Sequence, residues 1–215
     1  MDSVVGDYLV PLFFLAGTGA MWFLAYKFLN AKTALFKHFG IGLVLYGLGF
    51  AAWGVAVFTK SNVDLWTTVG VIPFASAHIF FLMAATEKLK TSVRTLVLCG
   101  GVGYLVALFF LRTFVYQSNP GFSDQGLFYF HAQAPVIALY ILAFTLSLLP
   151  AINAVSQAIK DKTLRAVSQI AFTILSVGGI ILVTSYDDDL QTINGWVMGI
   201  TWIVVLIAFS RKRIK

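Results

Sequence analysis

Seven apolar runs follow one another along this chain, each about as long as the hydrocarbon core of a bilayer is thick. A transmembrane α-helix needs roughly 20 mostly apolar residues to cross about 30 Å. We therefore expect an all-α, polytopic membrane bundle of seven transmembrane helices that occupies residues 1–215 as a single domain. The predicted spans lie near residues 8–28, 38–58, 66–86, 95–114, 127–149, 165–185 and 190–210.

Composition supports the bilayer as the environment. Of the residues, 59% are apolar and 11% are charged, whereas an ordinary soluble domain carries about 25% charged residues. Continuous apolar runs favour helices over a β-barrel, whose strands are about 10 residues long and alternate in polarity. The connections are too short for a separate soluble domain. We expect a multi-pass protein of the cell membrane, with lipid as its main partner.

Lysine and arginine mark every second connection. Thirteen of the 15 basic residues lie beside the first, third and fifth connections or in the C-terminal tail, and seven of the nine acidic residues lie on the other side. The positive-inside rule then predicts an N-terminus outside and a cytoplasmic C-terminus. The basic residues form short clusters and no continuous face, so we expect no nucleic-acid partner. The clusters are Lys27, Lys32, Lys37; Lys88, Lys90, Arg94; Lys160, Lys162, Arg165; and Arg211, Lys212, Arg213, Lys215, with Lys60, Arg112, Asp2, Asp7, Asp64, Asp124, Asp187, Asp188 and Asp189 opposite.

Titratable side chains limit the possible chemistry. Every Lys, Arg, Asp and Glu falls at a predicted span end or in a connection, which argues against a pump, a charge-coupled antiporter or a voltage sensor. His38, His78 and His131 fall at three different depths, so they cannot converge on one metal ion. No nucleophile–base pair or carboxylate pair falls at one depth. We expect no enzyme activity, no metal and no cofactor.

Polar residues inside the spans are the candidates for ligand binding. Pro73, in the outer half of the third span, removes one helix hydrogen bond and should kink that helix close to Ser76 and His78, where a cavity could form. A second group, near the outer ends of the fifth and seventh spans, could line an outward-facing pocket. The alternatives are a histidine that hydrogen-bonds a neighbouring helix and an interfacial belt of polar and aromatic residues. The candidate residues are Ser76, His78, His131, Gln133 and Asn194.

One resemblance rests on the third span and on the order of the helices. Leu65-Trp66, Pro73 seven residues after the tryptophan and Phe80-Phe81 beyond it, together with seven helices and basic connections, resemble the seven-transmembrane sensory regions at the N-termini of some bacterial histidine kinases. The resemblance implies a receptor-like module that binds a neutral or apolar ligand. Such regions normally precede a kinase or cyclase, whereas this sequence stops at Lys215, so the implied output passes to a separate cytoplasmic or membrane partner.

An internal similarity supports a second interpretation. Lys32-Thr33 precedes the second span and Lys162-Thr163 precedes the sixth, while Pro11 and Pro135 lie in the first and fifth. Two units of three helices around a linking fourth helix would match the parallel-repeat design of the sugar-carrying SWEET family. The alternative function is therefore transport of a small uncharged solute. The oligomeric state is open at this stage.

Overall fold

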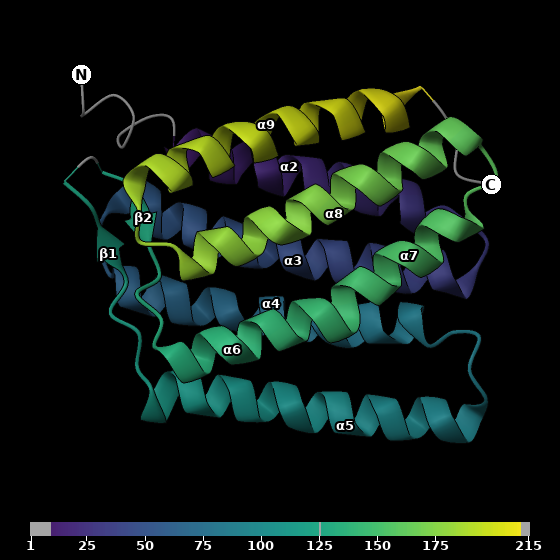
Figure 1. Cartoon of the computed structure of the whole chain (residues 1–215), viewed down its shortest axis with the longest axis horizontal. Helices are drawn as coiled ribbons and strands as arrows, with labels where there is room; N and C mark the ends of the chain where they lie inside the picture. Colours follow the sequence, from purple (N-terminus) through teal and green to yellow (C-terminus); the bar gives the residue numbers. More distant parts are fainter. Residues whose placement is uncertain (1–9, 125, 212–215) are drawn as a thin grey trace.

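A computed structural model describes residues 10–124 and 126–211. It contains seven helices long and apolar enough to cross a membrane, which confirms the predicted number and class of spans. They lie side by side along the long axis of the molecule (Figure 1). The predicted start of the first span at residue 8, and the charges of Asp2, Asp7, Lys212, Arg213 and Lys215, lie outside the described residues. The spans are α2 (Val10–Leu29), α3 (Ala34–Thr59), α4 (Val63–Ala85), α5 with the π-helical stretch η2 (Thr91–Phe110, Leu111–Val115), α6, η3 and α7 in one continuous span (Ala134–Ala143, Phe144–Leu148, Leu149–Ala158), α8 (Lys162–Thr184) and α9 (Asp188–Ser210).

Several helix ends are set by local side chains. The hydroxyl of Thr33 accepts a hydrogen bond from the backbone N–H of Phe36 at the start of α3. The carboxylates of Asp161 and Asp187 accept from backbone N–H groups three residues later, at 2.8 and 2.7 Å, at the starts of α8 and α9. Such N-caps satisfy donors that the first turn leaves free. They explain why these helices begin where the apolar runs begin.

Six of the spans form a ring, and the fourth lies outside it. Helix α3 lies between α2 and α4, and α8 lies between α7 and α9; contacts of α4 with α7 and of α2 with α9 close the ring. Helix α5 runs along one edge (Figure 1) and packs mainly on α4. Only 11% of its most apolar stretch is buried, against 33–56% in the other six spans. The fourth span is thus held far more loosely than the rest.

The ring is packed most closely between α3 and α4. A Cβ atom added at Gly49 would lie 3.0 Å from the carbonyl oxygen of Gly70, so the two backbones nearly touch. Close to this point the indole N–H of Trp53 donates to the carbonyl of Thr67 at 3.3 Å. Small residues that let helix backbones approach are the usual means of association in a bilayer, where apolar side chains gain little by leaving lipid.

The fifth span differs most from the sequence prediction. It begins at Ala134 and ends at Ala158, not near residues 127 and 149. The apolar residues before it form a short antiparallel pair of strands, β1 (Gly121–Phe122) and β2 (Phe128–Tyr129), which pairs Phe122 with Phe128. Pro135, in the first turn of α6, suits a helix start because its missing N–H has no partner there. The apolar run at 127–130 is buried against one end of the bundle without being helical.

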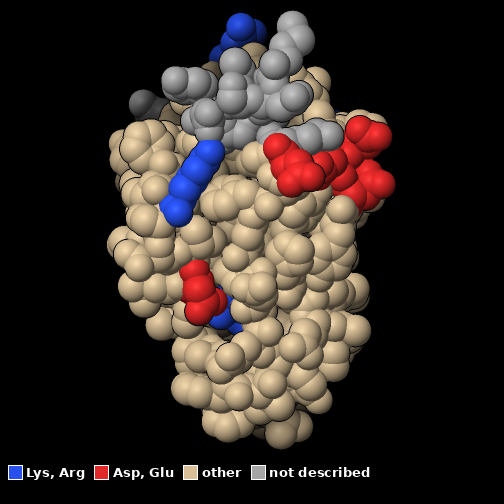
Figure 2. All heavy atoms as spheres, turned by 90° about the vertical axis from the view of Figure 1, so that its left-hand side faces the viewer, with Lys and Arg blue, Asp and Glu red and all other residues tan. Residues whose placement is uncertain are grey.

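Charge separates between the two ends of the bundle. The connections at 30–33, 86–90 and 159–161 lie at one end, called here the basic end, while the connections at 60–62, 116–133 and 185–187 lie at the opposite end. Figure 2 shows the opposite end, with acidic side chains gathered over the start of α9, where Asp187, Asp188 and Asp189 follow one another. The placement of the basic end in the cytoplasm stays a prediction.

Candidate functional site

A buried polar pair joins the third span to the fifth. Nδ1 of His78, on α4, lies 2.6 Å from Oγ of Ser147, on η3. The Ser147 hydroxyl also donates to the carbonyl of Ala143 in its own helix at 2.7 Å. The two side chains are only 1% and 2% exposed. A histidine placed at mid-span by sequence analysis therefore bonds a neighbouring helix, through a serine that sequence analysis did not select.

The π-helical stretch is what presents Ser147 to α4. In η3 the helix widens over Phe144–Leu148, and Pro150 follows in the first turn of α7. A π-turn inserts one extra residue per turn and rotates the side chains that follow, and such turns are frequent at functional sites. Pro150 lacks the N–H that would close a regular turn across this stretch. The span thereby stays helical while its polar residue faces the ring.

Aromatic rings fix the orientation of the imidazole. The ring of His78 lies 5.1 Å from that of Phe74 and 5.5 Å from that of Phe144, measured between centroids, with interplanar angles of 64° and 70°. Tyr46 and Phe81 contact it edge to face as well. Edge-to-face contacts of this kind restrict ring rotation and are favourable in themselves. The imidazole is therefore positioned before any ligand arrives.

Beside this pair lies a cavity of about 330 Å³ between α4, α5 and the fifth span. Its volume is at the lower end of the range for small-molecule pockets. Leu142 and Leu146 on its rim are 44% and 60% exposed, so the cavity opens sideways onto the surface that would meet lipid. The lining consists of His78, Leu82, Val97, Gly100, Gly101, Tyr104, Leu105, Leu142, Ala143, Leu146 and Ser147.

Helix α5 forms one wall of the cavity and has free space around two of its glycines. A Cβ atom added at Gly100 would meet no atom within 4 Å, and the same holds at Gly103, whereas one added at Gly101 would lie 2.4 Å from Leu82. The hydroxyl of Tyr104 donates to the carbonyl of Leu139 on α6. Within the α5 segment itself, Tyr104 thus provides a polar attachment to the fifth span, and the cavity separates the two helices beside it.

The other predicted site residues do not join His78. The Ser76 hydroxyl donates to the carbonyl of Ile72 in its own helix at 2.8 Å. His131 and Gln133 are exposed and lie in the non-helical segment before α6, not inside a span as predicted. Asn194 is buried, and its amide donates to the carbonyl of Gly178 at 2.9 Å, which joins α9 to α8. The five candidates therefore do not form one pocket.

The polar residues at the opposite end form structural contacts. Tyr129 donates to the carboxylate of Asp188, and Tyr186 donates to the carbonyl of Ala132 at 2.7 Å. Partial burial raises the pKa of Tyr186, so its hydroxyl keeps the proton that this bond uses. The amide of Gln191 donates to three carbonyls at the end of α8. These bonds fasten the 116–133 and 185–187 connections to the bundle.

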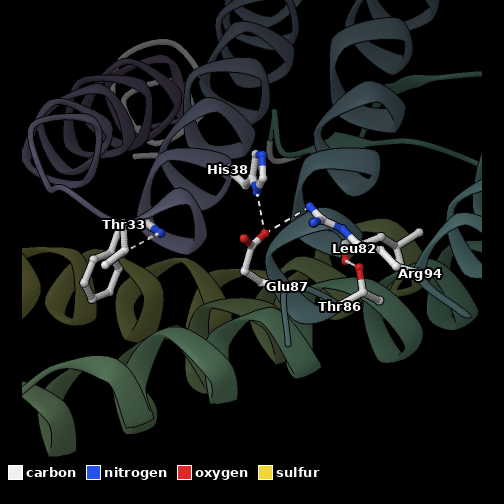
Figure 3. Close-up of polar contacts among 7 residues, drawn as sticks. Thr33, His38, Leu82, Thr86, Glu87 and Arg94 are labelled. Carbon is white, nitrogen blue, oxygen red and sulfur yellow. Dashed lines mark hydrogen bonds and ion pairs between the residues drawn. The ribbon is translucent and has the colours of Figure 1, made fainter. Parts of the chain in front are cut away.

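A charged cluster ties the start of α5 to the basic end. Oε2 of Glu87, in the α4–α5 turn, lies 3.3 Å from Nδ1 of His38 on α3 and 3.0 Å from a guanidinium nitrogen of Arg94 on α5 (Figure 3). The side chains are 19–27% exposed. The sequence prediction placed the charges of Glu87 and Arg94 in a connection or at a span end, and His38 at the start of a span. Their convergence on Glu87 requires the packing of three elements, which sequence patterns do not give.

Arg112 is a further residue that sequence analysis placed only as an exception to the charge pattern. It lies in η2, is 3% exposed, and donates to the hydroxyl of Thr68 on α4 at 3.0 Å. It also interacts with the buried Tyr140 on α6. The guanidinium thus joins the outer part of the fourth span to the third and fifth.

A second, smaller cavity of about 40 Å³ lies at the centre of the ring, with walls from all six ring spans and none from α5. Aromatic side chains fill most of the surrounding space, among them Tyr46, Phe50, Phe172 and Trp202. A cavity of this size holds water molecules but no larger solute. The larger, lateral cavity is therefore the better candidate site.

Metal ligands do not gather in the part of the chain that the structure describes, where no group of three His, Cys, Asp or Glu side chains could hold an ion. Compared with known proteins, the chain matches no family model, no curated protein and no solved structure. The comparisons therefore give no support to the predicted resemblance to sensory regions of histidine kinases. The fold itself shows seven helices that are long and apolar enough to cross a membrane, which indicates a multi-pass membrane protein.

Proposed function

We propose that this membrane protein is a receptor-like module that accepts a neutral, mostly apolar ligand from the bilayer into the lateral cavity, without catalysis, and passes the signal to a separate partner. One observation carries the proposal: a cavity of about 330 Å³ opens between α4, α5 and the fifth span, with the His78–Ser147 pair on its mostly apolar wall. Ligand sites combine a mostly apolar lining with a few fixed polar groups in this way.

The loosely held α5 supplies a route from ligand to output. Helices α4 and α5 both line the cavity, and the turn between them carries Glu87, which pairs with His38 and Arg94. We infer two arrangements, with α5 nearer to η3 and farther from it. A ligand that binds the second more tightly increases its population, to the extent set by the difference between the two affinities. The displacement changes the Glu87 cluster at the basic end, where a partner would detect it.

Photolabelling of the protein in lipid nanodiscs tests the binding step. The probe is decanol with a diazirine in its chain, and labelled residues are identified by mass spectrometry. We expect saturable labelling around Gly100–Leu105 and Leu142–Ser147 that unlabelled decanol competes away. Labelling that rises linearly with probe and is spread over all lipid-facing helices would refute the proposal.

Two glycine variants provide the matched comparison. Gly100→Leu fills the cavity from α5, whereas Gly103→Leu adds the same side chain three residues away, at a position outside the lining; neither Cβ meets an atom within 4 Å. We expect Gly100→Leu to reduce labelling to the non-saturable background and Gly103→Leu to leave it unchanged. Equal labelling of the two variants would show that the cavity is not the site.

A test of the output uses hydrogen exchange. Saturating decanol should change the exchange of backbone amides in residues 86–96, which contain Glu87 and Arg94. The change should occur in the Gly103→Leu variant but not in Gly100→Leu. If decanol binds saturably and this segment does not respond, the protein binds the ligand without the proposed signalling.

A second candidate function, transport of a small uncharged solute, is favoured by one observation. The first three spans and the last three form the ring, with the fourth outside it, as expected for two three-helix units joined by a linking helix. The test is uptake of glycerol and glucose into proteoliposomes. Uptake above that of protein-free vesicles, lost in Ser176→Leu at the central cavity but kept in Gly100→Leu, would favour transport over the receptor function.

A further inference from the structure

Burial divides the fourth span into two parts. None of residues 91–104 is buried, whereas Leu105, Leu108 and Arg112 are 5%, 1% and 3% exposed. These three residues lie three and four positions apart, so they share one face of the helix. The fourth span is therefore packed firmly on the ring toward the opposite end of the bundle, and it lies loosely beside the ring toward the basic end.

Arg112 fixes the packed part in place. It lies in the π-helical stretch η2, and its guanidinium donates to the hydroxyl of Thr68 on α4 at 3.0 Å and interacts with Tyr140 on α6. Moving a charged side chain from polar partners into lipid is costly. This end of the fourth span therefore stays where it is while the rest of the helix can move.

Among the residues that the structure describes, two polar side-chain contacts hold the remainder of α5. The hydroxyl of Tyr104 donates to the carbonyl of Leu139 on α6. At the basic end, Glu87 lies 3.0 Å from a guanidinium nitrogen of Arg94 and 3.3 Å from Nδ1 of His38, so it joins the start of α5 to α3 (Figure 3). A single hydrogen bond and a partly exposed ion pair each cost little to break.

The lateral cavity lies between these contacts and Arg112. Its lining on α5 extends from Val97 to Leu105, all of it on the basic side of Arg112. If the helix tilts about Arg112, these residues move away from α4 and the fifth span, and the displacement grows toward the basic end. A tilt of this kind widens the cavity and opens it toward the half of the bilayer nearer the basic end.

We propose that α5 is a hinged gate of the lateral cavity, which pivots about Arg112 and is held closed by the Tyr104 hydrogen bond and the Glu87 cluster. The ligand then enters from the half of the bilayer nearer the basic end. The inference rests on the proposed receptor function and specifies how its two arrangements interconvert. Arg112 and Glu87 act as positioning residues, because they set where α5 lies without contacting the ligand.

The expected movement is large enough to measure. By the rise of an α-helix, Val93 lies about 28 Å from Arg112 along the axis, so a tilt of about 10° displaces it by about 5 Å. The same tilt displaces Phe110 by less than about 1 Å. A rigid shift of the whole helix would displace both residues equally.

Distances between two nitroxide labels in nanodiscs test the hinge. The single cysteine is removed as Cys99→Ala, and the labels are attached to Ile207→Cys and to either Val93→Cys or Phe110→Cys. All three positions are exposed, and Ile207 belongs to α9, which lies across the ring from α5 (Figure 1). Double electron–electron resonance then gives the distribution of distances for each pair.

Glu87→Gln should release the gate without a ligand. In the Val93 pair we expect the share of a distance about 5 Å longer to rise by up to about fivefold, the most that a partly exposed ion pair supports. The Phe110 pair should keep its distance. Tyr104→Phe should act in the same direction, and Lys88→Gln, the control in the same turn, should have no effect. No change in the Val93 pair in either releasing variant, or an equal change in both pairs, would overturn the inference.

Arg112 is tested through the Phe110 pair. Arg112→Leu should let this distance lengthen as well, and Arg112→Lys, which keeps a charge that can donate to Thr68, should restore it. A Phe110 distance that is the same in all three proteins would show that Arg112 is not the pivot. Because Glu87 is partly exposed, its variant keeps the hinge testable if an Arg112 variant fails to fold.

Decanol connects the gate to the receptor function. Saturating decanol should raise the longer distance of the Val93 pair in the protein with an intact Glu87 cluster. Saturable photolabelling without this change would overturn the gate. If decanol labels the cavity without saturation, the receptor function fails, and the response to Glu87→Gln in the absence of ligand decides the hinge separately.

Discussion

The α3–α4 interface and the α5–η3 interface show two different ways in which helices meet in a bilayer. Where α3 meets α4, the glycines at 49 and 70 bring backbone against backbone, and Trp53 donates across the gap. Where α5 faces η3, the glycine at 100 has no atom near the position of a Cβ, and a cavity separates the helices.

The two interfaces differ because the glycines at 49 and 70 face a neighbouring backbone, whereas the glycine at 100 faces open space. In lipid, helix association depends on van der Waals packing and interhelical hydrogen bonds more than on removal of apolar surface from solvent. Glycines that face a neighbouring backbone increase that packing, whereas glycines that face open space leave contacts unmade. The ring is therefore stable by its own contacts, and α5 gains contacts when something fills the space beside it.

The largest effect on stability should come from placing a leucine at the close α3–α4 contact, compared with a leucine in the open space beside α5. Gly49→Leu forces the α3 and α4 backbones apart and should cost about 3 kcal/mol or more of unfolding free energy, as severe overpacking does. Gly103→Leu, in open space on α5, should change it by less than about 0.5 kcal/mol. Unfolding with SDS in mixed micelles measures both. Similar losses in the two variants would mean that α5 is packed as tightly as the ring.

A smaller effect should distinguish two serines that both donate to a carbonyl of their own helix. Ser147→Ala also removes the hydrogen-bond partner of Nδ1 of His78, so we expect a loss of about 1–2 kcal/mol. Ser76→Ala removes only the bond to the carbonyl of Ile72 and should cost under about 0.5 kcal/mol.

The double variant checks that the larger loss comes from the pair. In His78→Phe with Ser147→Ala, neither buried polar partner remains, so the combined loss should be smaller than the sum of the two single losses. Additive losses would mean that the two side chains act on stability independently.

The sequence predicts the seven helices well because the bilayer sets their length, whatever their neighbours are. It also places His78 in mid-span and identifies Asn194 as a polar residue inside a helix. It does not pair His78 with Ser147, because that contact depends on how α4 packs on the fifth span and on a π-turn that rotates Ser147 toward it. The one available signal was a serine in an apolar run shortly before Pro150.

His131 and Gln133 show a different limit. The run Leu127–Phe130 is apolar enough to be assigned to a membrane span, yet it contains a short strand that is buried at the end of the bundle. The helix begins only at Ala134, with Pro135 in its first turn. Hydropathy reports that a segment is buried but not whether lipid or protein covers it. For this reason the sequence analysis placed His131 and Gln133 inside a span, although they lie in the segment before it.

The smallest predicted effect concerns the cluster that holds α5 at the basic end. Glu87→Gln replaces a partly exposed carboxylate that pairs with His38 and Arg94, and such ion pairs contribute at most about 1 kcal/mol. Global stability should therefore hardly change. Because α5 has few other attachments, its backbone amides at 95–110 should nevertheless exchange hydrogen faster, while those of α3 and α4 do not, as expected when one segment opens independently of the rest. Lys88→Gln, which removes a charge from the same turn, serves as the control and should leave exchange in α5 unchanged. Faster exchange throughout α3, α4 and α5 would show that the fourth span opens together with the ring, and the distinction between a stable ring and a movable α5 would then be wrong.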